Sequence, residues 1–126
     1  MSMRTPLGRV RGLGSAKSGT EHWWLQRVTA IANIPLVIFL VFFVIRHLCV
    51  SRAEIVASIA NPFVAILLAL TFVSVLWHMR LGLQVVIEDY IHGHVAKFAA
   101  LLANGFVTVL LGVAALYAIL KMSFGL

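Results

Sequence analysis

Charged side chains are scarce in this sequence of 126 residues, and acidic ones are the scarcest. Only 11% of the residues are charged and four are acidic, whereas 62% are hydrophobic. A soluble domain is usually about 45–50% apolar and about 25% charged, so this composition excludes an ordinary soluble domain. It predicts a protein embedded in a lipid bilayer, with a length that supports a single domain, residues 1–126.

Cysteine occurs only once, as Cys49. A single cysteine excludes an intrachain disulfide and matches no metal-binding spacing, so we interpret Cys49 as a packing residue. The sequence also has no cysteine cluster for an iron–sulfur centre and no glycine-rich dinucleotide-binding motif. Redox centres of these two kinds are therefore not expected within the chain.

Three long apolar runs predict three transmembrane helices, at about 28–45, 63–87 and 98–120. Pro35 lies near the start of the first helix, where we expect a modest kink. Asn61 and Pro62 suit the start of the second helix. Glycines and alanines in the third helix favour close packing against a neighbour. The predicted fold is therefore an all-α membrane protein with three transmembrane helices and short connections.

Basic residues concentrate in segment 1–27, before the first predicted helix. The positive-inside rule places this segment in the cytoplasm and, after three crossings, the carboxyl terminus outside. Six basic residues then lie inside and three outside. Contact with membrane lipid of negative charge or with an acidic partner surface accounts for the net charge of +6, so nucleic acid is not invoked.

The arginine-rich amino-terminal segment has the composition of an organelle transit peptide. Because the sequence begins with Met1, we expect no such peptide to have been removed. A bacterial cell inner membrane is therefore the expected location of this multi-pass protein, with a mitochondrial inner membrane as the alternative.

The second predicted helix carries a small and polar face within an otherwise apolar span. At 3.6 residues per turn, this face consists of Thr71, Ser74, His78, Gly82, Val85 and Asp89. Gly82 lies one turn beyond His78 and leaves space beside the imidazole for a flat ligand or another helix. Ionisable side chains are costly in hydrocarbon, so His78 is a candidate functional residue.

Two roles suit His78. It can ligate a haem iron, in which case the second axial ligand must come from another chain. It can instead be a buried imidazole that forms a hydrogen bond with a neighbouring helix. The residues alone leave both roles open. The other histidines are not well placed to complete a haem site, because they lie at helix ends or in loops: His22, His47, His92 and His94.

Other polar residues of the second helix have interfacial interpretations. Arg80 points away from His78, because two residues turn a helix by about 200°. Its guanidinium can reach the inner interface, a haem propionate or a partner carboxylate. Glu88, Asp89 and Tyr90 mark the point where the helix leaves the membrane. A tyrosine hydroxyl there is also suited to donating a hydrogen bond to a quinone carbonyl.

Two patches of the sequence, together with their order along the chain, resemble the hydrophobic membrane-anchor D subunits of succinate dehydrogenase. One patch is His78-x-x-x-Gly82 followed by Asp89 and Tyr90 at the end of the second span. The other runs from residue 22 to residue 30 and contains an arginine, Arg27, shortly before a Thr-Ala pair. The resemblance covers the topology from about residue 18 to the end, although the third helix contributes no diagnostic residue.

The resemblance implies the site residues and the cofactors. His78 would be one axial ligand of a haem b, with iron as its metal and a histidine of the companion anchor as the other ligand. Tyr90 would donate a hydrogen bond to ubiquinone, with support from Asp89, and Arg27 would lie near the same pocket. His22 stands one residue closer to Arg27 than in some family members, so it receives no role.

The resemblance also implies the partners. The chain would pack with a second three-helix anchor subunit of the cytochrome b type, and the pair would bind an iron–sulfur subunit and a flavoprotein subunit on the inner face. Electrons would arrive from the iron–sulfur subunit. Alone, the chain should catalyse nothing, so it contains no catalytic residue of its own.

Three alternatives remain at this stage. A fumarate reductase membrane anchor has a similar architecture, although His78 with Gly82 favours the haem-bearing succinate type. A small membrane transporter would be expected to carry a carboxylate within the membrane, and none of the four acids lies there. A purely structural subunit is disfavoured by the polar face of the second helix.

Overall fold

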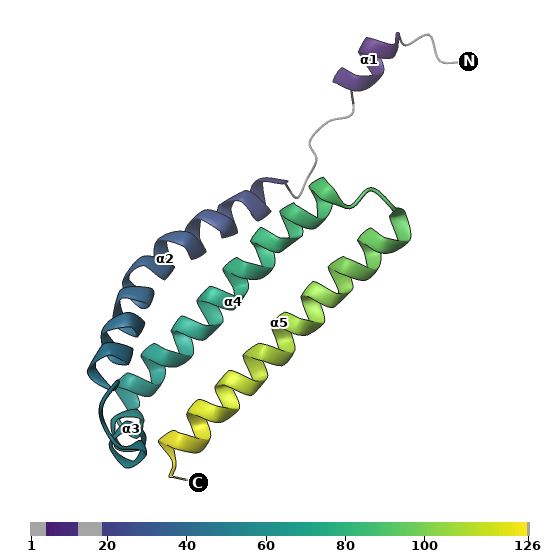
Figure 1. Ribbon diagram of the computed structural model, residues 1–126. Coiled ribbons are helices and arrows are strands. Elements are labelled where there is room, and N and C mark those ends of the chain that lie inside the picture. Colours follow the sequence, from purple (N-terminus) through teal and green to yellow (C-terminus); the bar gives the residue numbers. More distant parts are fainter. Residues whose placement is uncertain (1–4, 13–18, 126) are drawn as a thin grey trace.

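The computed structural model describes residues 5–12 and 19–125, and every regular element in these ranges is an α helix (Figure 1). The predicted all-α fold is therefore confirmed. Of the basic residues in segment 1–27, Arg4 and Lys17 lie outside the described residues. The elements are α1 (Pro6–Arg11), α2 (Gly19–Arg46), α3 (Arg52–Ile59), α4 (Pro62–Tyr90) and α5 (His94–Ser123).

Three of these helices, α2, α4 and α5, are long and apolar enough to cross a membrane, as the sequence predicted. They have 28, 29 and 30 residues, and each extends beyond its predicted apolar window at both ends. At 1.5 Å per residue such helices measure about 42–45 Å, whereas the hydrocarbon core is about 30 Å thick. The polar residues at their ends therefore continue the helix into the interfacial layers.

The three long helices form an open layer with α4 in the middle (Figure 1). Helix α4 packs against α2 on one side and α5 on the other, and within the described ranges the backbones of α2 and α5 do not come close to each other. Helix α2 curves along its length (Figure 1), and Pro35 removes one of its backbone hydrogen bonds, as expected for a kink. The middle position of α4 places its polar face against a neighbouring helix.

Helix α3 occupies part of the connection between α2 and α4, where the sequence analysis assigned no helix. It lies between α2 and α4 and packs against the ends of α4 and α5. Ser51 caps it by accepting a hydrogen bond from the backbone N–H of Glu54. Its last residue, Ile59, joins Leu68 of α4 and Ile119 of α5 in the hydrophobic core.

The start of α4 agrees with the sequence. Asn61 is the N-cap, and its side-chain oxygen accepts a hydrogen bond from the N–H of Phe63 at 2.9 Å. Pro62 occupies the first helical position, where the missing N–H has no intrahelical partner to lose. This cap fixes where α4 begins and therefore which residues face α2.

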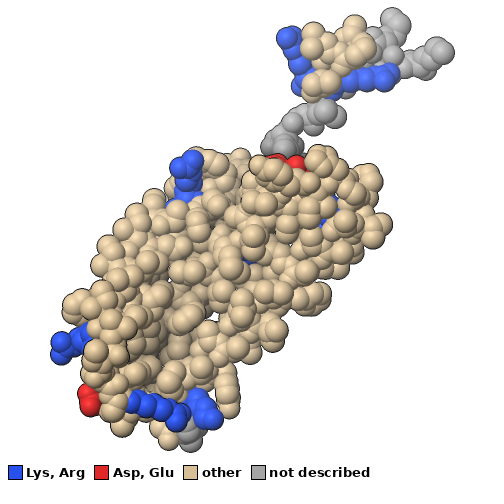
Figure 2. All heavy atoms as spheres, viewed as in Figure 1, with Lys and Arg blue, Asp and Glu red and all other residues tan. Residues whose placement is uncertain are grey.

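Charge is distributed as expected for a membrane-spanning layer. Most of the Lys and Arg side chains visible in Figure 2 protrude near its two ends, and the surface between them consists almost entirely of uncharged residues. Few large hydrophobic side chains are buried within the chain, whereas many are exposed. The exposed apolar faces are available to lipid and to other transmembrane helices.

Candidate functional site

His78 lies on the side of α4 that packs against α2, and it is half-buried. Its Nδ1 atom is 3.0 Å from Oγ1 of Thr29, a residue of α2. The hydrogen bond between them joins residues that are 49 positions apart in the sequence. The predicted functional histidine is therefore attached to a neighbouring helix through one ring nitrogen.

Polar contacts continue along the contact between the two helices, which we call the α2–α4 seam. The seam consists of three residues from each helix: Gln26, Thr29 and Asn33 of α2, and Ser74, His78 and Gly82 of α4. One turn from His78, the Ser74 hydroxyl donates a hydrogen bond to Oδ1 of Asn33 at 2.6 Å. One turn in the other direction, a Cβ atom on Gly82 would lie 3.8 Å from Nε2 of Gln26. The seam thus aligns α2 and α4 antiparallel through successive polar pairs.

This arrangement decides what the polar face of the second helix contacts. The sequence offered two uses for the space at Gly82, a flat ligand or another helix, and the structure places the Gln26 side chain of α2 beside it. Thr71, only 1% exposed, donates its hydroxyl to Leu67 of its own helix. Asp89, at the end of the same face, is exposed.

The hydrogen bonds of Thr29 allow a tautomer to be assigned to His78. The Thr29 hydroxyl lies 2.7 Å from the backbone oxygen of Leu25 and 3.2 Å from that of Gln26. A carbonyl oxygen can only accept, so we assign the single hydroxyl proton to these carbonyls, and Oγ1 then accepts from His78. With this assignment, His78 carries its proton on Nδ1 and keeps the lone pair on Nε2.

Nε2 of His78 is the atom left for a ligand. Among the described residues this atom has no hydrogen-bond partner. It is not fully enclosed by the rest of the chain, so a ligand can reach it. Neutral imidazole nitrogen is a common metal ligand, including for haem iron. No group of three or more His, Cys, Asp and Glu able to hold a metal lies within residues 5–12 and 19–125. One histidine would be enough for this chain to hold a haem, because the porphyrin nitrogens supply most of the ligands of the iron.

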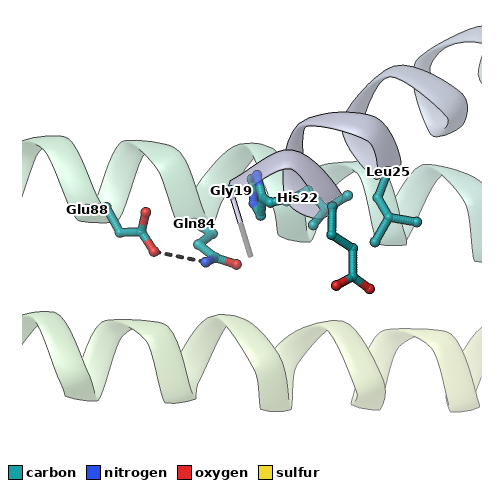
Figure 3. Close-up of a pocket in the computed structure, with 7 residues that line it drawn as sticks. Gly19, His22, Leu25, Gln84 and Glu88 are labelled. Atoms are coloured by element: carbon teal, nitrogen blue, oxygen red, sulfur yellow. Dashed lines mark hydrogen bonds between the residues drawn. The ribbon is translucent and has the colours of Figure 1, made fainter. Parts of the chain in front are cut away.

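A pocket of about 460 Å³ opens where α2 begins and α4 ends (Figure 3). Within it, the Gln84 amide donates a hydrogen bond to Glu88 at 2.8 Å, and His22 of α2 lies nearby. Nε2 of His22 and Oε1 of Gln26 are enclosed without a partner. The pocket is lined by Gly19, Glu21, His22, Leu25, Leu81, Gln84 and Glu88.

The residues predicted to hold a quinone lie at this same end of the layer. Tyr90 ends α4 and is 77% exposed, and Asp89 beside it is also exposed. The Arg27 guanidinium lies over the Trp23 ring, 5.3 Å from its centroid, and Arg27 lines a second pocket of about 420 Å³. In the described part of the chain, no hydrogen bond joins Tyr90, Asp89 and Arg27.

Arg80 lies on the opposite side of α4 from the seam, as predicted. Its guanidinium is 5.8 Å from the centroid of the Trp77 ring, and its backbone oxygen accepts a hydrogen bond from Asn104 of α5. Arg80 also lines an apolar groove with Gly105 and Phe106 of α5. Arg80 and His78 therefore face different neighbouring helices.

Sequence reasoning missed the partners that α2 provides. Gln26, Thr29 and Asn33 recur at spacings of three and four, which places them on one face of a helix. This polar face within an apolar span carries the same signal that identified the face of His78. Gln84 and Glu88 were missed as pocket residues because polar residues at this position are typical of the end of any membrane-spanning helix.

The geometry defines a class of protein: a membrane-embedded layer of three long helices with a half-buried histidine, His78, at the contact between two of them. Comparison with known proteins then gives the family. Residues 1–115 match the model of the succinate dehydrogenase/fumarate reductase transmembrane subunit. The chain belongs to this family, which confirms the resemblance seen in the sequence.

Individual relatives agree. The chain is 32% identical to the succinate dehydrogenase hydrophobic membrane anchor subunit of Paracoccus denitrificans, over 96% of this chain and 93% of the relative. It is 38% identical to the subunit of that name from Rickettsia bellii (strain RML369-C), over 70% of each. A succinate dehydrogenase membrane anchor subunit of Reclinomonas americana is 35% identical over 68% of this chain and 73% of the relative. No solved structure matches the chain.

We predict that Ser74→Ala lowers the stability of the α2–α4 seam by about 0.6 kcal/mol and at most about 2 kcal/mol, the range for hydrogen bonds between membrane helices. Denaturant titration of the detergent-purified protein measures this loss. Thr108→Val is the matched control, because the Thr108 hydroxyl bonds only to Asn104 of its own helix. Equal losses in the two variants would show that the seam hydrogen bond adds nothing specific.

Proposed function

We propose that this chain is the hydrophobic membrane-anchor subunit of a succinate:ubiquinone oxidoreductase. In this role it anchors the flavoprotein and iron–sulfur subunits to the membrane, supplies one axial ligand of haem b and forms part of the ubiquinone site. The observation that carries the proposal is His78, a half-buried histidine of a candidate membrane span with Nδ1 bonded to Thr29 and, among the described residues, no partner at Nε2. Family membership supports the same role.

His78 would hold the haem iron through Nε2. Haem b, when bound, would supply one-electron redox chemistry, with its second axial histidine coming from the companion anchor subunit. The fit rests on the donor set: an imidazole held by Thr29 through one ring nitrogen, within an apolar span. Because one ligand comes from each chain, the haem would form only between two anchors.

The open layer supports a companion subunit. Helix α4 is flanked by α2 and α5, whose backbones do not come close to each other in the described ranges, so the exposed faces of the layer remain available to further helices. A second three-helix subunit of the cytochrome b type would cover part of this apolar surface. The rest would face lipid, and residues 1–126 would act as one membrane domain.

The positive-inside rule supports a cytoplasmic amino terminus in a bacterial inner membrane, with a mitochondrial inner membrane as the alternative. This orientation puts the start of α2 and the end of α4 on the inner side, together with the pocket of Figure 3. The iron–sulfur and flavoprotein subunits would then bind at this end, close to Tyr90, and the carboxyl terminus would lie outside.

Tyr90 would donate a hydrogen bond to a ubiquinone carbonyl, and Asp89 and Arg27 would support this site. Reduction of a quinone requires two electrons and two protons, so the pocket needs apolar walls, a hydrogen-bond donor and a link to water. The end of α4 offers an exposed tyrosine hydroxyl beside acidic side chains. The remaining walls would come from the partner subunits.

The family description also covers fumarate reductase anchors. His78 and Gly82 favour the haem-bearing succinate type over an anchor without haem. Family membership argues against a small transporter.

The first test is the dithionite-reduced minus oxidised spectrum of the complex purified through a tag on this chain, together with identification of the co-purifying subunits. We expect the absorption bands of a b-type haem in the spectrum, and a flavoprotein and an iron–sulfur protein among the co-purifying subunits. Absence of the haem and of the flavoprotein, iron–sulfur and companion anchor subunits would contradict the proposal.

His78→Ala should remove the b-type haem from the purified complex, with the three transmembrane helices retained. The variant lacks the imidazole of the seam, and therefore the Nε2 atom that would bind the iron. Haem per complex, measured by the pyridine haemochrome spectrum, is the readout. His92→Ala is the control, because His92 lies between α4 and α5 and is exposed. An unchanged haem content in His78→Ala would refute the ligand assignment.

Tyr90→Phe should lower succinate–ubiquinone reductase activity about fivefold to tenfold, the rate equivalent of one hydrogen bond worth about 1–1.4 kcal/mol. Haem content and electron transfer from succinate to a soluble dye should stay unchanged, because neither uses the tyrosine hydroxyl. Tyr117→Phe, at the other tyrosine of the chain, is the matched control. Full quinone reductase activity in Tyr90→Phe would remove Tyr90 from the site.

A further inference from the structure

Thr29 is the one residue of α2 that forms a hydrogen bond with His78. Its hydroxyl has a single proton and two lone pairs, and the proton is directed to the backbone oxygen of Leu25 at 2.7 Å. Oγ1 therefore accepts the Nδ1 proton of His78. The chain of bonds runs in one direction, from the imidazole to the hydroxyl and on to the helix backbone.

The direction of these hydrogen bonds matters because water is excluded from the hydrocarbon layer. An imidazole whose N–H lost its acceptor there would have few other partners, and it would be free to rotate or to exchange tautomers. A hydroxyl that itself donates to a carbonyl is also polarised as an acceptor. Thr29 thus holds the His78 ring in one orientation and keeps the lone pair on Nε2.

We propose that Thr29 is a positioning residue for haem ligation: it fixes the tautomer and the ring orientation of His78 and increases the electron donation of Nε2 to the iron. The inference rests on the proposed function, because it requires a haem at His78. Metal-binding histidines generally donate their second ring N–H to a fixed acceptor, and loss of that acceptor typically weakens metal binding by about 10-fold to 100-fold.

The neighbouring pair separates this role from simple helix packing. Ser74 and Asn33 lie one turn away and join the same two helices through a bond of 2.6 Å, but their hydrogen bond does not involve His78. If Thr29 only holds α2 against α4, loss of the Ser74 hydroxyl should affect the haem as much as loss of the Thr29 hydroxyl. If Thr29 acts through the imidazole, only its own hydroxyl should matter.

The experiment compares four variants of the purified complex. Thr29→Val removes the hydroxyl with little change of shape, Thr29→Ser keeps it, Ser74→Ala is the packing control and His78→Ala reports the ligand. Haem per complex after dilution into detergent gives relative retention, and a spectroscopic redox titration gives the midpoint potential. Low-spin electron paramagnetic resonance of the oxidised complex reports the ligand field. None of these readouts depends on turnover.

Thr29→Val should retain haem about 10-fold to 100-fold less tightly, with Thr29→Ser and Ser74→Ala close to the unmodified complex. The midpoint potential should rise in Thr29→Val, because a less electron-donating imidazole stabilises ferric iron less. A tenfold change in the preference for ferric over ferrous haem corresponds to about 59 mV for a one-electron couple. A shift in the low-spin resonance should accompany it.

Different results would overturn different claims. Unchanged haem retention and potential in Thr29→Val, with haem lost in His78→Ala, would refute the positioning role and leave the proposed function intact. Equal effects of Thr29→Val and Ser74→Ala, or of Thr29→Val and Thr29→Ser, would also refute it. Retention of haem in His78→Ala would remove the ligand assignment and this inference together.

Discussion

The need to satisfy polar groups in a medium without water governs this structure. Within hydrocarbon, an unpaired polar side chain is costly, so the polar side chains of α2 and α4 meet each other. The bonds between Thr29 and His78 and between Ser74 and Asn33 set the alignment of the two helices. Because this alignment gives Nδ1 of His78 its partner, it also determines which ring nitrogen remains free. The fold and the candidate ligand thus depend on the same contacts.

A second consequence of the membrane is that the layer stays open. Lipid tails are as apolar as leucine, so little is gained by closing three helices into a bundle around a hydrophobic core. The buried cluster is small and lies where α3 meets α4 and α5, at the opposite end of the layer from the pocket of Figure 3. The apolar faces on either side of α4 can therefore be used by lipid and by other subunits. An exposed Tyr90 and a histidine with one free nitrogen agree with sites that are completed only on assembly.

The sequence predicted most of the elements but not how they meet. Apolar runs located the three long helices, and Asn61 with Pro62 located the start of α4, because both signals are local. Helix α3 was missed because its eight residues of mixed character show no clear hydrophobic period. The helix is stabilised instead by the packing of Ile59 into the core. Periodicity put His78 on a polar face, but it does not say which helix covers that face. That information lies in the matching polar face of α2, where Thr29 is 49 residues away from His78 in the sequence.

The two interpretations of His78 that the sequence left open do not exclude each other. A histidine that only packed between helices would be expected to satisfy both ring nitrogens, as His47 does with the backbone oxygen of Phe43 and the hydroxyl of Ser58. His78 has one bond to a neighbouring helix and, in the described residues, no partner at Nε2. In the proposed role, the bond to Thr29 holds the imidazole in place and leaves the other nitrogen for a ligand. The contact between the helices and the proposed ligation would then use different nitrogens of one ring.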